Sequence, residues 1–206
     1  EEVSWSPDGG RLAFISDRNG DADLYTYDLK TRRTQQLTST PGLAEGSPLY
    51  SPDGKWLAYT RGANASELCL VPAEGGEPRV LVGEPSVGNP RWSPDSRWLA
   101  YHLAKGHSAG TLAEVYLVNA VEPGARPVNI TRYPGINGDV TWSRDGRRLF
   151  FLSDRAGTPP QLYSVTLADP RNSEGEGGAE GAPDAARVDL EDIHLRARQL
   201  SRLDSM

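Results

Sequence analysis

The stretch "WSPDGGRLAF", from Trp5 to Phe14, decides the fold because the chain contains it four times. It returns as "YSPDGKWLAY" at Tyr50, as "WSPDSRWLAY" at Trp92 and, less regularly, as "WSRDGRRLFF" at Trp142. The opening aromatic residues are spaced by 45 residues (5 to 50), 42 residues (50 to 92) and 50 residues (92 to 142). A period of this length is typical of repeat proteins, among them β-propellers, whose blades are four strands of roughly 40–50 residues.

Each copy carries the alternation expected of strands. A leucine stands seven residues after the opening aromatic residue and an aromatic residue two further on, so both face the same side of a strand. These residues are Leu12, Leu57, Leu99 and Leu149, followed by Phe14, Tyr59, Tyr101 and Phe151. A third strand is expected in "DLYTYDL", "ELCLVPA", "EVYLVNA" and "QLYSVTL", and a fourth in "TQQLT", "PRVLV", "PVNIT" and "ARQLS", where Leu37, Leu81, Ile130 and Leu200 are equivalent.

These patterns predict an all-β fold, a β-propeller built from four-stranded antiparallel blades. We expect the propeller to span 1–201, with blades at about 1–38, 42–82, 86–131 and 135–201. In "SPDG", proline, glycine and the two polar side chains favour a tight hairpin turn between the first two strands of a blade. The opening aromatic residues are expected to pack between adjacent sheets, because one blade cannot bury both of its faces.

One segment interrupts the repeat. "DPRNSEGEGGAEGAPDAAR", 169–187, is rich in Gly, Glu and Ala and lacks aromatic residues. It cannot bury enough apolar surface to offset its ordering entropy, so we predict a flexible acidic, Gly-rich insertion between the last two strands. Residues 202–206 are interpreted as the start of a linker.

The repeated phrase resembles the WD-like propeller repeat of TolB, of tricorn-type proteases and of prolyl oligopeptidase relatives. The stretch "VDLEDIHLRARQLSRL", from Val188 to Leu203, resembles the closing strand of the propeller in tricorn-like serine peptidases. The resemblance implies a propeller of six or seven blades, of which four are visible here. In the tricorn-like family, the propeller precedes a PDZ-like module and a serine protease domain.

Two functions follow from this resemblance. The first is a non-catalytic propeller domain that binds or admits peptide substrates in a tricorn-like serine peptidase. The alternative is a TolB-like scaffold for protein–protein interaction without peptidase activity. The implied partners are peptides or another protein, and self-association is expected if the propeller is incomplete. The implied compartment is the cytoplasm for a tricorn-like protein and the periplasm for a TolB-like one.

Composition narrows the alternatives further. The net charge of −6 disfavours nucleic acid as a partner, because the phosphate backbone is itself anionic. No run of about 18 apolar residues is present, so no membrane span is expected. The single cysteine, Cys69, excludes an internal disulfide framework. Cys69 takes the place of a tyrosine in the other copies, which predicts a packed thiol rather than a reactive one.

Three motifs suggest chemistry that their context does not support. "GHSAG" at 106–110 matches the nucleophile elbow, with Ser108 as nucleophile, but it falls in a predicted hairpin loop instead of a strand-to-helix turn. "DRNGDAD" at 17–23 begins like a calcium loop but lacks the turn glycine and the final glutamate. His102, His107 and His194 show no metal-ligand spacing. We therefore expect no catalytic residue, metal site or cofactor in this chain.

One set of positions is a candidate binding site. Three residues before each opening aromatic residue stands a polar residue: Glu2, Ser47, Asn89 or Asp139. The first strand of a propeller blade lines the central channel, so these side chains are expected to ring one mouth of it. A polar wall also arises merely because a channel is wet, so the pattern leaves both interpretations open.

Overall fold

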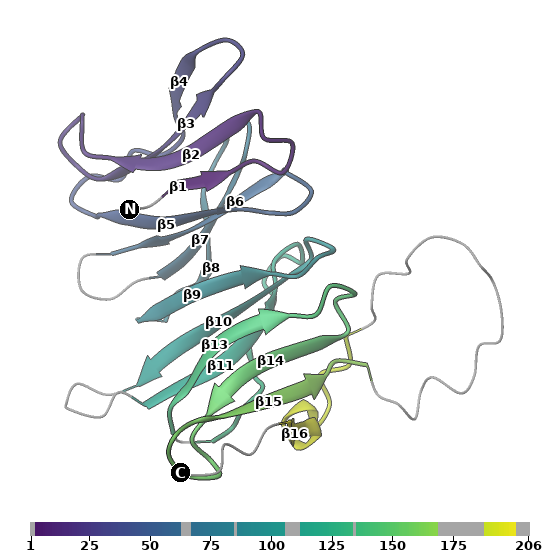
Figure 1. The fold of residues 1–206 in the computed structure, drawn as a ribbon. Coiled ribbons are helices and arrows are strands. Elements are labelled where there is room, and N and C mark those ends of the chain that lie inside the picture. Colours follow the sequence, from purple (N-terminus) through teal and green to yellow (C-terminus); the bar gives the residue numbers. More distant parts are fainter. Residues whose placement is uncertain are drawn as a thin grey trace, which may run out of the picture.

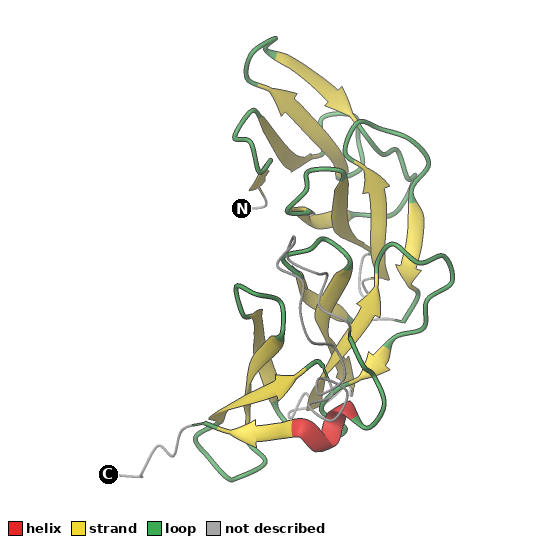
Figure 2. Ribbon diagram, turned by 90° about the vertical axis from the view of Figure 1, so that its right-hand side faces the viewer, coloured by secondary structure: helices red, strands yellow, loops and turns green. Residues whose placement is uncertain are grey.

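The computed structural model describes residues 3–62, 67–84, 86–105, 112–133, 135–168 and 188–200. In this part of the chain, sixteen strands form four antiparallel sheets of four strands each, which confirms the predicted fold class. Figures 1 and 2 show the sheets stacked in chain order as an arc. Within the described residues, no helix is long and apolar enough to span a bilayer.

Each sheet is one blade whose strands pair in chain order. Blade 1 contains β1 (Val3–Trp5), β2 (Arg11–Ser16), β3 (Asp23–Asp28) and β4 (Arg33–Gln36), and blade 2 contains β5 (Glu45–Tyr50), β6 (Trp56–Arg61), β7 (Glu67–Pro72) and β8 (Arg79–Val82). Blade 3 contains β9 (Val87–Trp92), β10 (Trp98–Lys105), β11 (Leu112–Asn119) and β12 (Val128–Asn129), and blade 4 contains β13 (Asn137–Trp142), β14 (Arg148–Ser153), β15 (Gln161–Thr166) and β16 (Ala197–Gln199). The residue limits of the blades given above remain our proposal.

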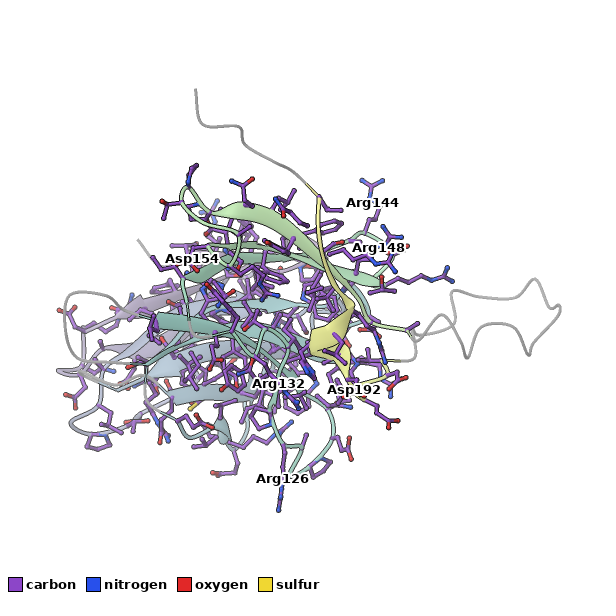
Figure 3. The ribbon with its side chains drawn as sticks, turned by 90° about the horizontal axis from the view of Figure 1, so that it is seen from below. Arg126, Arg132, Arg144, Arg148, Asp154 and Asp192 are labelled. Carbon is purple, nitrogen blue, oxygen red and sulfur yellow. The ribbon has the colours of Figure 1, made fainter. Side chains whose placement is uncertain are left out.

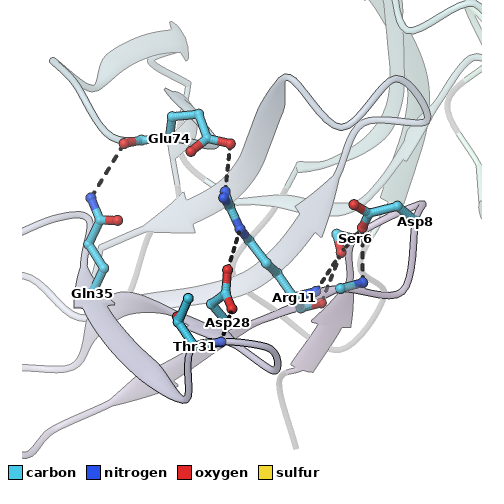
Figure 4. A network of polar contacts seen from close by, with 8 residues as sticks. Ser6, Asp8, Arg11, Asp28, Thr31, Gln35 and Glu74 are labelled. Carbon is cyan, nitrogen blue, oxygen red and sulfur yellow. Dashed lines mark hydrogen bonds and ion pairs between the residues drawn. The ribbon is translucent and has the colours of Figure 1, made fainter.

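The repeated "SPDG" is the hairpin turn between the first two strands of a blade. In the first copy, Ser6 Oγ donates to Asp8 Oδ1 (2.6 Å), and the same Oδ1 accepts from Gly10 N (2.9 Å). These hydrogen bonds lower the pKa of Asp8, that from Ser6 most strongly. Figure 4 shows how the turn leads into Arg11, which donates to Glu74 of blade 2 (2.6 Å) and so ties the two blades together.

The two irregular copies of the turn keep the same geometry. Ser96 stands where the other copies have glycine and adopts a φ of 61°, close to the 70° of Gly9. Its hydroxyl accepts a hydrogen bond from Asp53 N of blade 2 (2.9 Å), which compensates for the left-handed backbone. Arg144 replaces proline in the fourth copy and projects from the hairpin into solvent (Figure 3).

The hydrophobic core lies in the three joints between successive blades. At each joint, small and aliphatic side chains of one blade pack against the opening aromatic residue and the aromatic residues of the next. Trp92 Nε1 donates to Leu49 O (3.2 Å), and Trp142 Nε1 donates to Arg91 O (3.0 Å). Each of these indoles therefore crosses a joint and binds the first strand of the preceding blade.

Three sequence predictions need correction. Trp5 was expected to pack between sheets, but it is 57% exposed because no sheet of the described residues covers its face. Val82 rather than Leu81 takes the buried position of the fourth strand in blade 2, since a bulge shifts the register between Cys69 and Leu68. His194 lies in a 3-10 helix, η2 (Ile193–Arg196), and not in the closing strand.

Candidate functional site

The candidate channel residues lie on the first strands of blades 2, 3 and 4. Ser47, Asn89 and Asp139 are exposed and adopt positive φ angles of 52°, 49° and 51°. Each sits at a break in the register between the first two strands of its blade. A left-handed backbone costs a non-glycine residue roughly 1–2 kcal/mol, although asparagine and aspartate tolerate it better than serine. The same strained bulge thus presents a polar side chain three times.

Ser47 and Asn89 share a cavity of about 190 Å³ between blades 2 and 3. Its wall also contains Arg91, an exposed cation whose Nη1 donates to Pro90 O (3.0 Å). Val3, Leu49 and two prolines supply the apolar part of the lining. The lining of this cavity therefore combines a hydroxyl, an amide and a guanidinium with apolar side chains, as is common in ligand-binding cavities.

Behind Asp139 lies His102, a residue for which the sequence showed no role. His102 Nε2 accepts a hydrogen bond from Val140 N across the joint between blades 3 and 4 (3.4 Å). Burial lowers the pKa of His102, Asp139 opposes this effect, and Arg91 adds to it. The sequence shows that His102 is a polar residue on a second strand. It does not show that the bulge at Asp139 of the next blade lies beside it.

The structure brings only part of the predicted set together. Ser47 and Asn89 line one cavity, whereas Asp139 lies on the next blade beside His102. Glu2 lies outside the described residues, as do Ser108 and His107, the insertion 169–187 and the residues 202–206. Cys69 is fully buried, as predicted, and burial raises its pKa to about 11.

The calcium-like segment forms a turn. Gly20 N donates to Asp17 O (2.9 Å), and Asp23 accepts from Gln36 Nε2 (2.8 Å) and from Thr40 N (3.2 Å). Protein groups thus occupy the oxygens of Asp23 that a metal would need. Among the described residues, no cluster of three or more His, Cys, Asp or Glu could hold a metal ion.

Acidification should destabilise the joint between blades 3 and 4. The pKa of His102 lies below its ordinary value of 6.5 in the folded protein, so the unfolded chain takes up the proton first as the pH falls. The contribution of His102 to the free energy of unfolding is therefore complete above pH 6.5 and is lost as the pH falls below that value. His102→Leu should abolish this loss because leucine does not titrate. The leucine should be accommodated, since Ile15 and Leu152 take the equivalent position in blades 1 and 4.

The measurement compares melting temperatures at pH 7.5 and pH 5.5. We expect the wild type to lose about 2–4 °C more than the His102→Leu variant, as about 1 kcal/mol does in a chain of this size. Comparison with the variant is needed because burial raises the pKa of Glu45, which favours the folded state on acidification. Identical pH slopes in the two proteins would show that His102 does not titrate in this way.

Comparison of the chain with known proteins identifies a matching family. The family model for the TolB beta propeller domain matches residues 47–176. The chain is 31% identical over 169 residues to the uncharacterized peptidase YuxL of Bacillus subtilis, covering 77% of this chain and 23% of that protein. It is 30% identical over 154 residues to the TolB homolog of Chlorobium chlorochromatii, covering 71% of this chain and 32% of that protein.

Solved structures show the same fold at lower sequence identity. The tricorn protease has a TM-score of 0.77 at 18% identity, covering 97% of this chain and 21% of its own. TolB from Acinetobacter baumannii has a TM-score of 0.61 at 21% identity, covering 81% of this chain and 40% of its own. The chain spans only a quarter to a third of the length of the two curated relatives. Since the family model matches more than half of its residues, the chain belongs to the family of TolB β-propeller domains.

Proposed function

We propose that this chain is the non-catalytic propeller portion of a tricorn-like serine peptidase, in which it binds or admits peptide substrates. Two similarities support this proposal. The fold follows the tricorn protease over 97% of the chain, and the relative from Bacillus subtilis is named a peptidase. A non-catalytic propeller would then select substrate for a catalytic unit elsewhere in the protein.

The recurrent strained bulge carries the proposal. Glycine would adopt the same backbone angles without strain, yet Ser47, Asn89 and Asp139 keep a polar side chain there. Residues held in unfavourable backbone regions cluster at functional sites, where the strain serves the position of a side chain. We infer that these three side chains contact the peptide, with Arg91 beside Asn89 as a fourth contact.

Replacing all three residues by glycine should weaken peptide binding at least tenfold without unfolding the protein. Relief of left-handed strain offsets the entropy that glycine adds to the unfolded chain, so the free energy of unfolding should stay within about 1 kcal/mol of the wild type. Fluorescence anisotropy with a pool of labelled decapeptides should show affinity at least tenfold weaker than in the wild type. Undiminished binding by the triple variant would exclude this site.

A TolB-like scaffold for protein–protein interaction is the second candidate. The match to the TolB propeller model and to the Chlorobium TolB homolog favours it. Such a scaffold would bind a folded protein, and the triple glycine variant would retain that binding if the contact lies on the blade faces or hairpins. If the wild type binds decapeptides and the glycine variant does not, the result favours the peptidase propeller. If the chain binds folded proteins and no decapeptides, the result favours the scaffold.

A further inference from the structure

Blades 2, 3 and 4 share a bulge in their first strand. In each bulge, two residues of the first strand lie opposite a single aromatic residue of the second strand, so part of the backbone is left outside the ladder. The first residue of each pair is a candidate peptide contact, and the second is buried. The opposed residues are Ser47 and Pro48 with Tyr59, Asn89 and Pro90 with Tyr101, and Asp139 and Val140 with Phe151.

Proline removes the backbone N–H at the second position in two of these three bulges. Pro48 in blade 2 and Pro90 in blade 3 take this position, and proline has no backbone donor. Blade 4 has Val140 there, which is 3% exposed and keeps its N–H. A buried donor without an acceptor is costly, so among these three bulges only that of blade 4 requires a partner for this group.

His102, on β10 of blade 3, is that partner. Its Nε2 accepts the hydrogen bond from Val140 N across the joint (3.4 Å). A Cβ placed on Gly138 would lie 4.0 Å from His102 Cε1, so the imidazole ring lies against the start of the bulge. The blades that precede the two proline bulges have Ile15 and Thr60 at the equivalent position. A histidine thus precedes the one bulge of the three that retains a donor.

We propose that His102 is a positioning residue, which holds the bulge of blade 4 in the shape that presents Asp139 to a peptide. This inference rests on the proposed function of the bulges. A neutral imidazole accepts at Nε2 when its proton is on Nδ1. Without that acceptor, the N–H of Val140 is unpaired in a buried place, and the bulge must shift to bring it to water or to another acceptor. Asp139 immediately precedes Val140, so its side chain moves with the shift.

Protonation of His102 should act on the bulge as loss of the imidazole does. An imidazolium has donors on both ring nitrogens and cannot accept from Val140 N. Burial lowers the pKa of His102 below 6.5, so the neutral form predominates at pH 7.5. Two charged groups also act on His102, since Asp139 favours the protonated form and Arg91 disfavours it. The affinity of the wild type for peptides should therefore fall when the pH is lowered from 7.5 to 5.5.

The test compares the effect of His102→Leu in two backgrounds. Val140→Pro removes the donor and copies the sequence of the other two bulges. In the wild type, His102→Leu should weaken binding of the labelled decapeptides at pH 7.5 about fivefold, as loss of one hydrogen bond does. In the Val140→Pro background, the same substitution should change the affinity by less than about twofold, because no donor is left unpaired. Fluorescence anisotropy measures the affinity, and circular dichroism verifies that each variant is folded.

His102→Gln keeps the test decisive if proline is not accommodated at position 140. The amide oxygen of glutamine can accept from Val140 N, and the amide does not titrate. This variant should bind decapeptides within about twofold of the wild type at pH 7.5, because the hydrogen bond is retained. It should also lose less affinity than the wild type at pH 5.5.

Two results would overturn the role of His102 and leave the proposed function standing. One is equal weakening of peptide binding by His102→Leu in both backgrounds. The other is a His102→Gln variant that binds as weakly as His102→Leu. A wild type that binds no decapeptide would contradict the proposed function, and this inference with it.

Discussion

Replacing Phe151 with alanine is expected to lower the free energy of unfolding by about 3–5 kcal/mol, the usual loss for a buried aromatic residue. Phe151 is fully buried at the joint between blades 3 and 4. Its ring stacks on Tyr163 with centroids 5.8 Å apart, and the Arg155 guanidinium lies 5.5 Å from its centroid. The substitution removes packing from both blades at once and leaves a cavity between them. Urea denaturation at low micromolar concentration measures the loss.

Phe14 provides the matched control. It stacks on Tyr25 at the same distance of 5.8 Å, and Arg18 lies 5.3 Å from its centroid. The local cluster is the same, but no sheet of the described residues covers it, and Phe14 is half-buried. Phe14→Ala should therefore cost less than about 1.5 kcal/mol in the dilute protein. Equal losses at the two positions would show that the neighbouring blade adds nothing to the stability of the cluster.

Replacing Asn137 with aspartate is expected to cost about 3–5 kcal/mol at pH 7, the loss typical of a buried charge without a partner. Asn137 is fully buried, and its Nδ2 donates to Ala113 O (2.8 Å) and Tyr133 O (3.0 Å). Aspartate would instead place a carboxylate against these carbonyl oxygens. Burial and the neighbouring carbonyl oxygens both raise the pKa of the new carboxyl. The loss of stability should therefore shrink as acidification protonates this group.

Asn129 is the control for this chemistry. Its Oδ1 accepts hydrogen bonds from Thr131 N (3.0 Å) and Arg132 N (2.8 Å), a role that a carboxylate can perform. Only the donation from Nδ2 to the Tyr116 hydroxyl (3.3 Å) would be lost. Asn129→Asp should therefore change the free energy of unfolding by less than about 1 kcal/mol. A comparable loss of stability at both positions would mean that the hydrogen bonds donated by Asn137 Nδ2 do not stabilise the loop between blades 3 and 4.

The sequence predicts most residues of the candidate site but not the shape of the site. The column of Ser47, Asn89 and Asp139 follows from the repeat, since equivalent positions in a repeat take equivalent places. The positive φ angles and the contribution of Arg91 and His102 do not follow from it. The φ angles depend on the register break between the first two strands of each blade, and the contacts of Arg91 and His102 depend on how neighbouring blades approach each other.

The sequence by itself determined the blade. The period, the alternation of apolar residues and the "SPDG" turn are local features, and they specify four strands and the hairpin that joins the first two. Only the tertiary structure decided which of the equivalent residues are buried. Trp5 and Trp92 open the same phrase, yet one is 57% exposed and the other 8%, because burial depends on whether a second sheet covers the first.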